Sequence, residues 1–174
     1  MLNKMKLPGL FLGRFQPFHN GHLHALKEIF QKEEKLIIVI GSAQASYTPN
    51  NPFSASERFQ MIDGVLEEIE IPCSRYWIVP VPDIHNYPRW VSHVKQFVPP
   101  FGMFYTGSDT SAKLFQDHGV PVSRISLFEK PLYSGKEVRR RMIAGEEWQP
   151  VVPQIVAKLI ERFDGVDRIK SLND

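Results

Sequence analysis

The chain has 174 residues, of which 43% are hydrophobic and 23% charged, values that are ordinary for one soluble globular domain. Its formal net charge of +2 permits anionic ligands without requiring nucleic acid, and it contains no apolar run long enough to cross a bilayer. A single cysteine, Cys73, excludes an internal disulfide and favours a cytoplasmic location. We therefore expect one domain over residues 1–174, with neither nucleic acid nor a membrane as partner.

Short apolar runs alternate with amphipathic segments along the chain. Residues 9–13 predict a strand, and the helical period of residues 20–32 predicts a helix. That helix would bury the face formed by Leu23, Leu26, Ile29 and Phe30. Residues 35–41 are a continuous and largely β-branched run, which is typical of a strand covered on both faces.

The next predicted helix, over residues 54–69, has a recognisable start. Ser54 is the expected N-cap, and Glu57 three residues later would complete a capping box. The apolar stripe of this helix would consist of Phe59, Ile62, Val65, Leu66 and Ile69.

The rest of the chain continues the alternation. Strands are predicted at residues 75–81, 103–107 and 121–127, and helices at residues 89–98, 110–119, 135–145 and 153–163. Strands that alternate with helices imply a parallel sheet with right-handed crossovers. The pattern therefore predicts a doubly wound α/β fold with helices at its C-terminal end.

The stretch GRFQPFHNGH joins the first strand to the first helix. In an open parallel sheet, ligands bind beyond the carboxyl ends of the strands, where this stretch lies. Gly13 and Gly21 would let the backbone approach a ligand closely or take unusual dihedral angles, and Asn20 is a candidate N-cap. The free N–H groups of a helix start and the imidazoles of His19 and His22 are donors that suit phosphate oxygens.

Other interpretations of the two histidines were weighed. A histidine in a loop is often only solvated, and a histidine pair can ligate a metal ion. No cysteine or third ligand is spaced nearby to complete a metal site, so we expect no metal ligand in the chain. The stretch also matches neither the Gly-x-Gly-x-x-Gly fingerprint nor the Walker loop.

The same stretch resembles the His-x-Gly-His signature of the nucleotidyltransferase superfamily, and YSGKEVRRRM, at residues 133–142, resembles its second signature, Ile-Ser-Ser-Thr-x-x-Arg. The segments GSAQASYTPNNPFSASER, PVPDIHNYPRW and VPPFGMFYTG resemble the archaeal-type nicotinamide-nucleotide adenylyltransferases, over nearly the whole chain. One departure is Lys136, which stands where many relatives have threonine. The resemblance implies a Rossmann-like nucleotidyltransferase fold.

The resemblance also implies a reaction: nicotinamide mononucleotide (NMN) and ATP give NAD and pyrophosphate. The acceptor's 5′-phosphate would attack the α-phosphorus in line, without a covalent enzyme intermediate, so that catalysis would consist of positioning and charge stabilisation. Mg²⁺, held mainly by the triphosphate, would offset charge on the leaving pyrophosphate. Relatives of this type are homo-oligomers, often hexamers, which is our expectation here.

The site residues implied by the resemblance fall into three groups. The expected catalytic residues are His19, His22, Arg14 and Arg139. The expected ATP-binding residues are Gly13, Phe15, Gly21, Gly107, Asp109, Ser134, Gly135 and Lys136. The expected acceptor-binding residues are Ser42, Asp83 and Trp90.

Two of these groups leave alternatives open. Arg139, Arg140 and Arg141 are consecutive and point about 100° apart on a helix, so only one or two can face ATP, and the motif position favours Arg139. Trp90 would stack on the nicotinamide ring or be a core aromatic. Asp83 would bind ribose or carboxamide, or cap a helix.

Three competing functions were considered. A sister adenylyltransferase would use nicotinate mononucleotide, phosphopantetheine or flavin mononucleotide as acceptor. The run of arginines suggests a non-catalytic nucleic-acid-binding module, but the net charge is small and basic residues are not interleaved with aromatic ones. A class I aminoacyl-tRNA synthetase fragment shares the histidine motif, but the chain has no Lys-Met-Ser-Lys-Ser-like loop.

Overall fold

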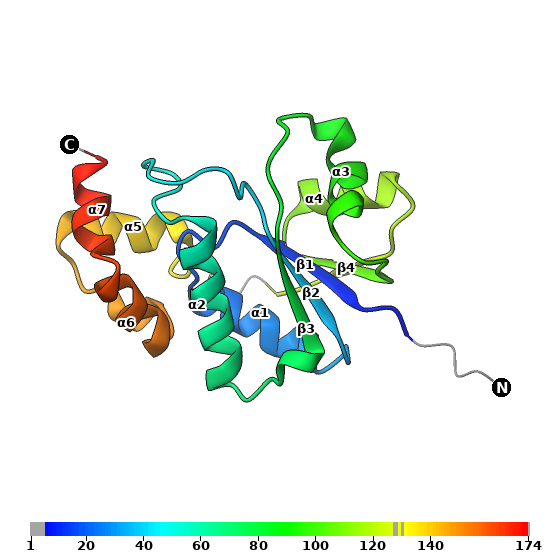
Figure 1. Ribbon diagram of the computed structural model, residues 1–174, viewed down its shortest axis with the longest axis horizontal. Coiled ribbons are helices and arrows are strands. Elements are labelled where there is room, and N and C mark those ends of the chain that lie inside the picture. Colours follow the sequence, from blue (N-terminus) through cyan, green and yellow to red (C-terminus); the bar gives the residue numbers. More distant parts are fainter. Residues whose placement is uncertain (1–5, 127–128, 130, 174) are drawn as a thin grey trace.

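The computed structural model describes residues 6–126, 129 and 131–173. Its centre is a five-stranded parallel sheet with the strand order β3-β2-β1-β4-β5 (Figure 1). The strands are β1 (Gly9–Gly13), β2 (Leu36–Ile40), β3 (Tyr76–Pro80), β4 (Met103–Thr106) and β5 (Val122–Arg124). Every predicted strand is present, although β5 is shorter than predicted; Leu127, at the end of that predicted strand, lies outside the described residues.

Helices connect successive strands and continue after the last one. They are α1 (Asn20–Phe30), α2 (Ala55–Glu68), α3 (Trp90–Phe97), α4 (Asp109–Asp117), α5 (Gly135–Ala144), α6 (Gln154–Arg162) and α7 (Gly165–Ser171). The predicted doubly wound α/β fold is therefore confirmed. The sequence pattern missed α7, because seven residues are too few to display a helical period.

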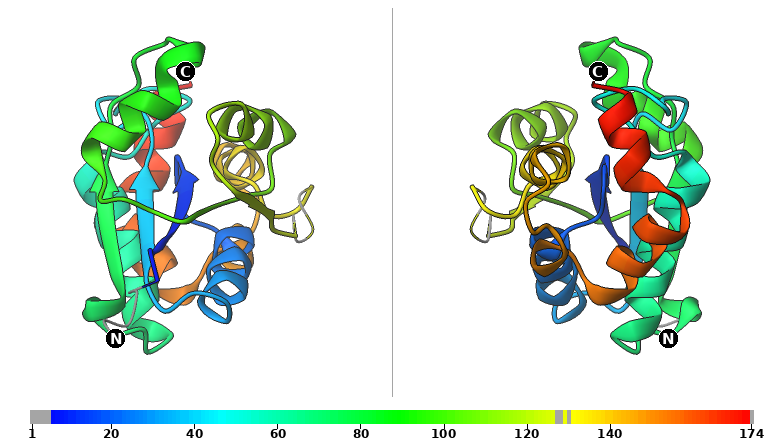
Figure 2. Two further views of the ribbon diagram at one scale, coloured as in Figure 1. Left: turned by 90° about the vertical axis from the view of Figure 1, so that its right-hand side faces the viewer. Right: turned by 90° about the vertical axis from the view of Figure 1, so that its left-hand side faces the viewer.

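The two faces of the sheet carry two separate hydrophobic cores. Along β2, Leu36, Ile38 and Ile40 enter one core, while Ile37 and Val39 enter the other, so that all five residues are buried as predicted. The first core is shared with α1, α2 and the C-terminal helices, and the second with α3 and α4. Figure 2 (right) shows α6 and α7 in front of the strands.

The strand order places a ligand crevice at one point of the sheet. From β1 the chain winds outward through β2 to β3 and then returns to β4 on the other side of β1. The loops that follow β1 and β4 therefore diverge, and such a switch point is where open α/β sheets bind ligands.

The start of α2 is as predicted, and Ile62, Val65, Leu66 and Ile69 of the predicted apolar stripe pack in the first core. The Ser54 Oγ accepts from the Glu57 N–H at 3.2 Å, and a Glu57 carboxylate oxygen accepts from the Ser54 N–H at 2.8 Å. Phe59, predicted to be in the stripe, is 39% exposed, whereas Arg58 and Met61 are buried. The inward face of α2 thus begins with a charged side chain.

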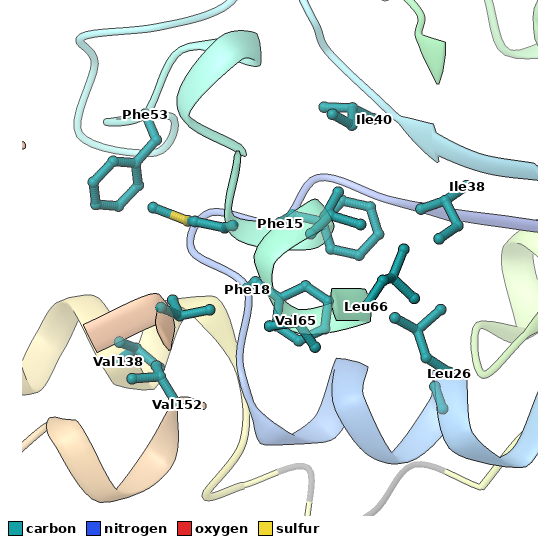
Figure 3. Close-up of a cluster of buried hydrophobic side chains, with 14 of the residues drawn as sticks. Phe15, Phe18, Leu26, Ile38, Ile40, Phe53, Val65, Leu66, Val138 and Val152 are labelled. Atoms are coloured by element: carbon teal, nitrogen blue, oxygen red, sulfur yellow. The ribbon is translucent and has the colours of Figure 1, made fainter. Parts of the chain in front are cut away.

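Aromatic residues from loops complete the first core. Figure 3 shows Phe15, Phe18 and Phe53 among the aliphatic side chains of the sheet and helices. All three are buried. The loops beside the crevice are therefore anchored from below by large apolar side chains.

The C-terminal helix α7 is tied back to the start of α2. The Arg168 guanidinium pairs with the Glu57 carboxylate at 2.8 Å and donates to the carbonyl oxygen of Pro52 at 3.2 Å. It also lies 4.5 Å from the centre of the Tyr47 ring. No helix within the described ranges is long and apolar enough to span a membrane.

Candidate active site

Two adjoining hollows open at the carboxyl edge of the sheet. The first, of about 250 Å³, is lined by Phe11, Leu12, His19, Gly21, His22, Ala25, Thr106, Gly107, Ser108, Ile125, Ser126, Tyr133 and Ser134. The second, of about 540 Å³, is lined by Leu12, Arg14, Gly41, Ser42, Asp83, His85, Asn86, Tyr87, Trp90 and Ser111. Leu12, near the end of β1, belongs to both, so the hollows share a wall.

The two histidines begin α1 in an arrangement that differs from the prediction. His19 is the N-cap, with φ −142° and ψ 171°, and Asn20 is the first helical residue instead of the cap. The Asn20 side chain donates to the carbonyl oxygen of Pro150 at 2.9 Å. The imidazole rings of His19 and His22 are stacked, with centroids 3.7 Å apart.

Hydrogen bonds fix the tautomer of one histidine. The backbone N–H of His19 donates to Nδ1 of His22 at 3.3 Å. Because Nδ1 is the acceptor, the proton of neutral His22 is on Nε2, where it can be donated to a ligand. Nδ1 of His19 is buried and has no hydrogen-bond partner among the residues that the structure describes.

Burial keeps both imidazoles neutral at physiological pH. It lowers the pKa of His19 to about 4. Burial, and secondarily the neighbouring His19, hold the pKa of His22 well below its ordinary value. In the structure described here, both histidines can therefore offer a ligand a neutral N–H donor.

This neutrality has a consequence for stability. An unfolded histidine, with a pKa near 6.5, takes up a proton before buried His19 does, so stability is lost as pH falls from about 6.5 toward 4. For His19 alone we expect a loss of about 2 kcal/mol between pH 8 and pH 5. Urea unfolding at both pH values measures it, and His19→Asn, which does not titrate, should show a shallower loss. Equal losses in the two proteins would contradict the assignment.

The glycines of the first motif make room for rings. A Cβ on Gly21 would lie 3.0 Å from Nδ1 of His19, and one on Gly13 would lie 2.9 Å from the Phe15 ring. Neither glycine has a positive φ, so the expected unusual dihedral angles are absent. The Phe15 side chain is 1% exposed, and its ring packs 4.6 Å from that of His22 and supports it from behind.

The start of α5 forms another wall of the first hollow. Ser134 caps the helix, its Oγ accepting from the Glu137 N–H at 3.2 Å. A Cβ on Gly135 would lie only 2.8 Å from the carbonyl oxygen of Gln16, so a glycine is needed for this approach. The same carbonyl accepts from the Arg139 guanidinium at 2.6 Å. The two signature motifs are thus in direct contact.

The three consecutive arginines have separate surroundings. Arg139 is 9% exposed, and burial, together with the charge of Arg14, lowers its pKa. Arg140 pairs with Glu137 and Glu146, and Arg141 pairs with Glu137. Only Arg139 is therefore directed toward the first motif, as the helical spacing predicted.

Two predicted ATP contacts lie outside the first hollow. Lys136 is exposed and is not among the lining residues. The Asp109 side chain is 96% exposed and pairs with Arg124. Gly107, directly after β4, does line the hollow. The end of β4 thus lines the hollow through Thr106, Gly107 and Ser108.

The second hollow brings together the predicted acceptor residues Ser42, Asp83 and Trp90, and also Arg14. Arg14, which is expected to contact the ATP phosphates, lines this second hollow together with the predicted acceptor residues. The Asp83 carboxylate accepts from the His85 N–H at 2.8 Å instead of capping a helix. Trp90 begins α3 and is half-buried. It packs against the second hydrophobic core and also lines the second hollow.

Side chains that the sequence analysis missed hold the loops together. The Gln16 amide exchanges two hydrogen bonds with the backbone of Phe53, at 2.7 and 2.9 Å. The Gln44 amide does the same with Asp83, at 3.1 and 2.9 Å. Both glutamines stand in the quoted motifs, but nothing in those motifs indicates their partners. The lining residues Thr106, Ser108 and Ser126 were also missed. Thr106 ends β4, and Ser108 and Ser126 follow β4 and β5, so they lie where open parallel sheets bind ligands.

Comparison with known proteins agrees with this geometry. Residues 10–141 match the model of the cytidylyltransferase-like family. Nicotinamide-nucleotide adenylyltransferase of Thermococcus kodakarensis is 46% identical over 94% of this chain and 87% of its own length. That of Picrophilus torridus is 44% identical over 94% of this chain and 95% of its own length.

The chain belongs to the cytidylyltransferase-like family, in its nicotinamide-nucleotide adenylyltransferase branch. It is a nucleotidyltransferase. A solved structure of a bifunctional NMN adenylyltransferase/ADP ribose pyrophosphatase from Francisella tularensis, complexed with AMP and a manganese ion, shares the fold. The TM-score is 0.77 at 24% identity, and the match covers 97% of this adenylyltransferase but only 52% of the Francisella chain.

Proposed function

We propose that this protein transfers the adenylyl group of ATP to the 5′-phosphate of NMN, giving NAD and pyrophosphate. The observation that carries the proposal is the pair of hollows on either side of Leu12. One contains two neutral imidazoles at a helix start, and the other contains a tryptophan and an arginine. This arrangement suits a triphosphate and a pyridine nucleotide whose phosphates meet at the shared wall.

The chemistry needs no protein nucleophile. A phosphate oxygen of NMN attacks the α-phosphorus in line, the new P–O bond forms as the bond to the β-phosphate oxygen breaks, and pyrophosphate leaves. Nε2–H of His22 would donate to a nonbridging oxygen as negative charge develops. Arg139, which uses one donor on Gln16, has further N–H groups for the departing pyrophosphate. Arg14 would hold the attacking phosphate.

The donor groups of the site suit a magnesium ion that arrives with ATP. Asp83 supplies the carboxylate among the residues lining the two hollows, and it accepts from a backbone N–H. Over the described part of the chain there is no cluster of three or more side chains that could hold a metal ion. We therefore propose that Mg–ATP is the substrate and that the ion supplies charge neutralisation at the triphosphate.

The direct test is product analysis. Purified protein would be incubated with ATP, Mg²⁺ and, in parallel, NMN, nicotinate mononucleotide, phosphopantetheine or flavin mononucleotide. We expect NAD and pyrophosphate in equal amounts from NMN. Absence of NAD from NMN would overturn the proposal, and turnover of another acceptor alone would assign the protein to a sister activity.

Trp90 offers a sharper test of the acceptor site. We expect Trp90→Ala to raise the KM for NMN by about tenfold with kcat little changed, because stacking on a cationic ring stabilises the bound acceptor by about 1.4 kcal/mol. Trp77→Ala is the matched control, since Trp77 is also partly exposed but lines neither hollow. An unchanged KM for NMN in Trp90→Ala would place the nicotinamide ring elsewhere.

Three further expectations remain proposals. We propose that the chain acts as one domain, supported by the contacts of Arg168 with Glu57 and Pro52. We also propose a homo-oligomer, with a hexamer as the expected size, supported by exposed apolar side chains such as Tyr47 and Phe97. The free thiol of Cys73 supports a cytoplasmic location.

A further inference from the structure

One arginine beneath the site makes no contact with either hollow. Arg58, in the first turn of α2, is 0% exposed and forms no ion pair within the described ranges. Its guanidinium donates to the carbonyl oxygens of Arg14 (3.0 Å), Gly41 (2.8 Å), Ser42 (3.2 Å), Ala43 (3.5 Å), Ala45 (3.4 Å) and Ser54 (3.2 Å). A buried charge satisfied only by carbonyl groups is uncommon, since buried charges are usually paired.

The carbonyls that Arg58 binds belong to the ends of two neighbouring strands. Arg14 follows β1, and Gly41 and Ser42 follow β2. Arg14 and Ser42 both line the second hollow, which is the proposed acceptor site. One guanidinium therefore fixes the backbone of both residues from below.

The same two strand ends hold strained backbone. Phe15, next to Arg14, has φ +51°, and Ser42, next to Gly41, has φ +48°. Residues other than glycine persist in this region only where their surroundings hold them, at about 1–3 kcal/mol each. The bonds from Arg58 to the carbonyls of Arg14, Gly41 and Ser42 supply that restraint.

We infer that Arg58 is a positioning residue for the transfer reaction: it sets the ends of β1 and β2 relative to each other, and so aligns the attacking phosphate with the adenylyl group. The inference rests on the proposed function. In-line transfer depends on this alignment, whereas each substrate's own binding contacts do not involve Arg58. Loss of the restraint should therefore appear in kcat and not in KM.

Lysine cannot replace this guanidinium. An ammonium group has three donors at one point, whereas the planar guanidinium has five spread over a fork. Arg58→Lys retains the positive charge but loses the planar arrangement of donors, whereas Arg58→Met loses both. Comparing the two variants therefore distinguishes the effect of the charge from that of the hydrogen-bond geometry. Burial, and secondarily Arg14, lower the pKa of Arg58 to about 10, so that it stays charged at neutral pH.

The chain contains a matched control in Arg75. This arginine, directly before β3, also donates to three carbonyl oxygens: those of Glu34 (2.8 Å), Glu33 (2.7 Å) and Phe30 (3.4 Å). It lies at the opposite edge of the sheet from the hollows, because parallel strands begin there. If the role of Arg58 were purely structural, Arg58 and Arg75 variants would both lower the unfolding midpoint and leave kcat little changed.

The experiment compares wild type, Arg58→Lys, Arg58→Met and Arg75→Met by steady-state kinetics, unfolding midpoint and binding of each substrate alone. Wild type must first form NAD from ATP and NMN, a step whose failure would reject the proposed function and not the role of Arg58. We expect kcat to fall about 100-fold in both Arg58 variants, with both KM values within about threefold of wild type. Arg75→Met should lower the unfolding midpoint while kcat stays within about twofold.

Three results would overturn the inference. The first is a folded Arg58→Lys with a kcat close to that of Arg75→Met. The second is a loss that resides entirely in the KM of one substrate. The third is failure of both Arg58 variants to fold where Arg75→Met folds, which would assign Arg58 to stability alone.

Discussion

Replacing His22 by alanine is expected to lower kcat by about 100- to 1,000-fold and to change the Kd for ATP by only a few-fold. Nδ1 of His22 accepts from the His19 N–H, so Nε2–H is the group that His22 would offer a ligand in the proposed reaction. A neutral donor of this kind binds ground-state phosphate weakly. It contributes most when charge builds up on the oxygens of the five-coordinate phosphorus.

Rapid-quench measurement of a single turnover, combined with calorimetric ATP binding, separates these two effects. His24→Ala is the control, because His24 lies on the same helix but does not line the hollow. His22→Gln, which can present an amide N–H in a similar place, should recover part of the lost rate. An unchanged kcat in His22→Ala would reject the role assigned to this histidine.

The second large effect concerns Arg139. We expect Arg139→Met to lower kcat/KM for ATP by about 100-fold or more, because the variant loses the charge that meets the departing pyrophosphate. It also leaves the carbonyl oxygen of Gln16 without this donor, a loss of about 1–3 kcal/mol that unfolding measurements would register. Arg139→Lys should restore charge but not the bidentate geometry, and so recover the rate only in part.

The neighbouring Arg140 provides a control that distinguishes a catalytic role of Arg139 from an effect on the stability of α5. Arg140→Met removes an arginine from the same turn of α5, but one whose partners are Glu137 and Glu146. Steady-state kinetics of Arg140→Met should match wild type. If the Arg139 and Arg140 variants lost activity equally, the effect would belong to the stability of α5 and not to catalysis.

Local sequence patterns predicted the fold well because each element carries its own signal. The unbroken apolar run of β2 and the capping box of Ser54 and Glu57 depend on neighbours in the chain. The position of His19 and His22 at the edge of the sheet followed from the same patterns. The prediction of Asn20 as N-cap was wrong: intrinsic preference favours asparagine, but the helix is capped one residue earlier at His19, whose N–H donates to the His22 side chain.

The parts that could not be predicted depend on contacts between distant residues. Arg58 stands on the apolar stripe of α2, which signals burial, but its partner Arg14 is 44 positions away. Arg139 and Gln16 are 123 positions apart. The pattern within one segment can show that a charged side chain lies on a buried face. It does not show which distant carbonyl oxygens accept the hydrogen bonds of that side chain.

The wall formed by Leu12 bears on the fate of the product. Each substrate occupies one hollow in the proposed reaction, but NAD contains both halves in one molecule and keeps contacts on both sides of Leu12. After one half of NAD has dissociated, the half that is still bound keeps it near its hollow at a high effective concentration. Rebinding of the free half therefore competes with complete dissociation of NAD. In the proposed reaction, release of the dinucleotide therefore requires both halves to dissociate before either one rebinds.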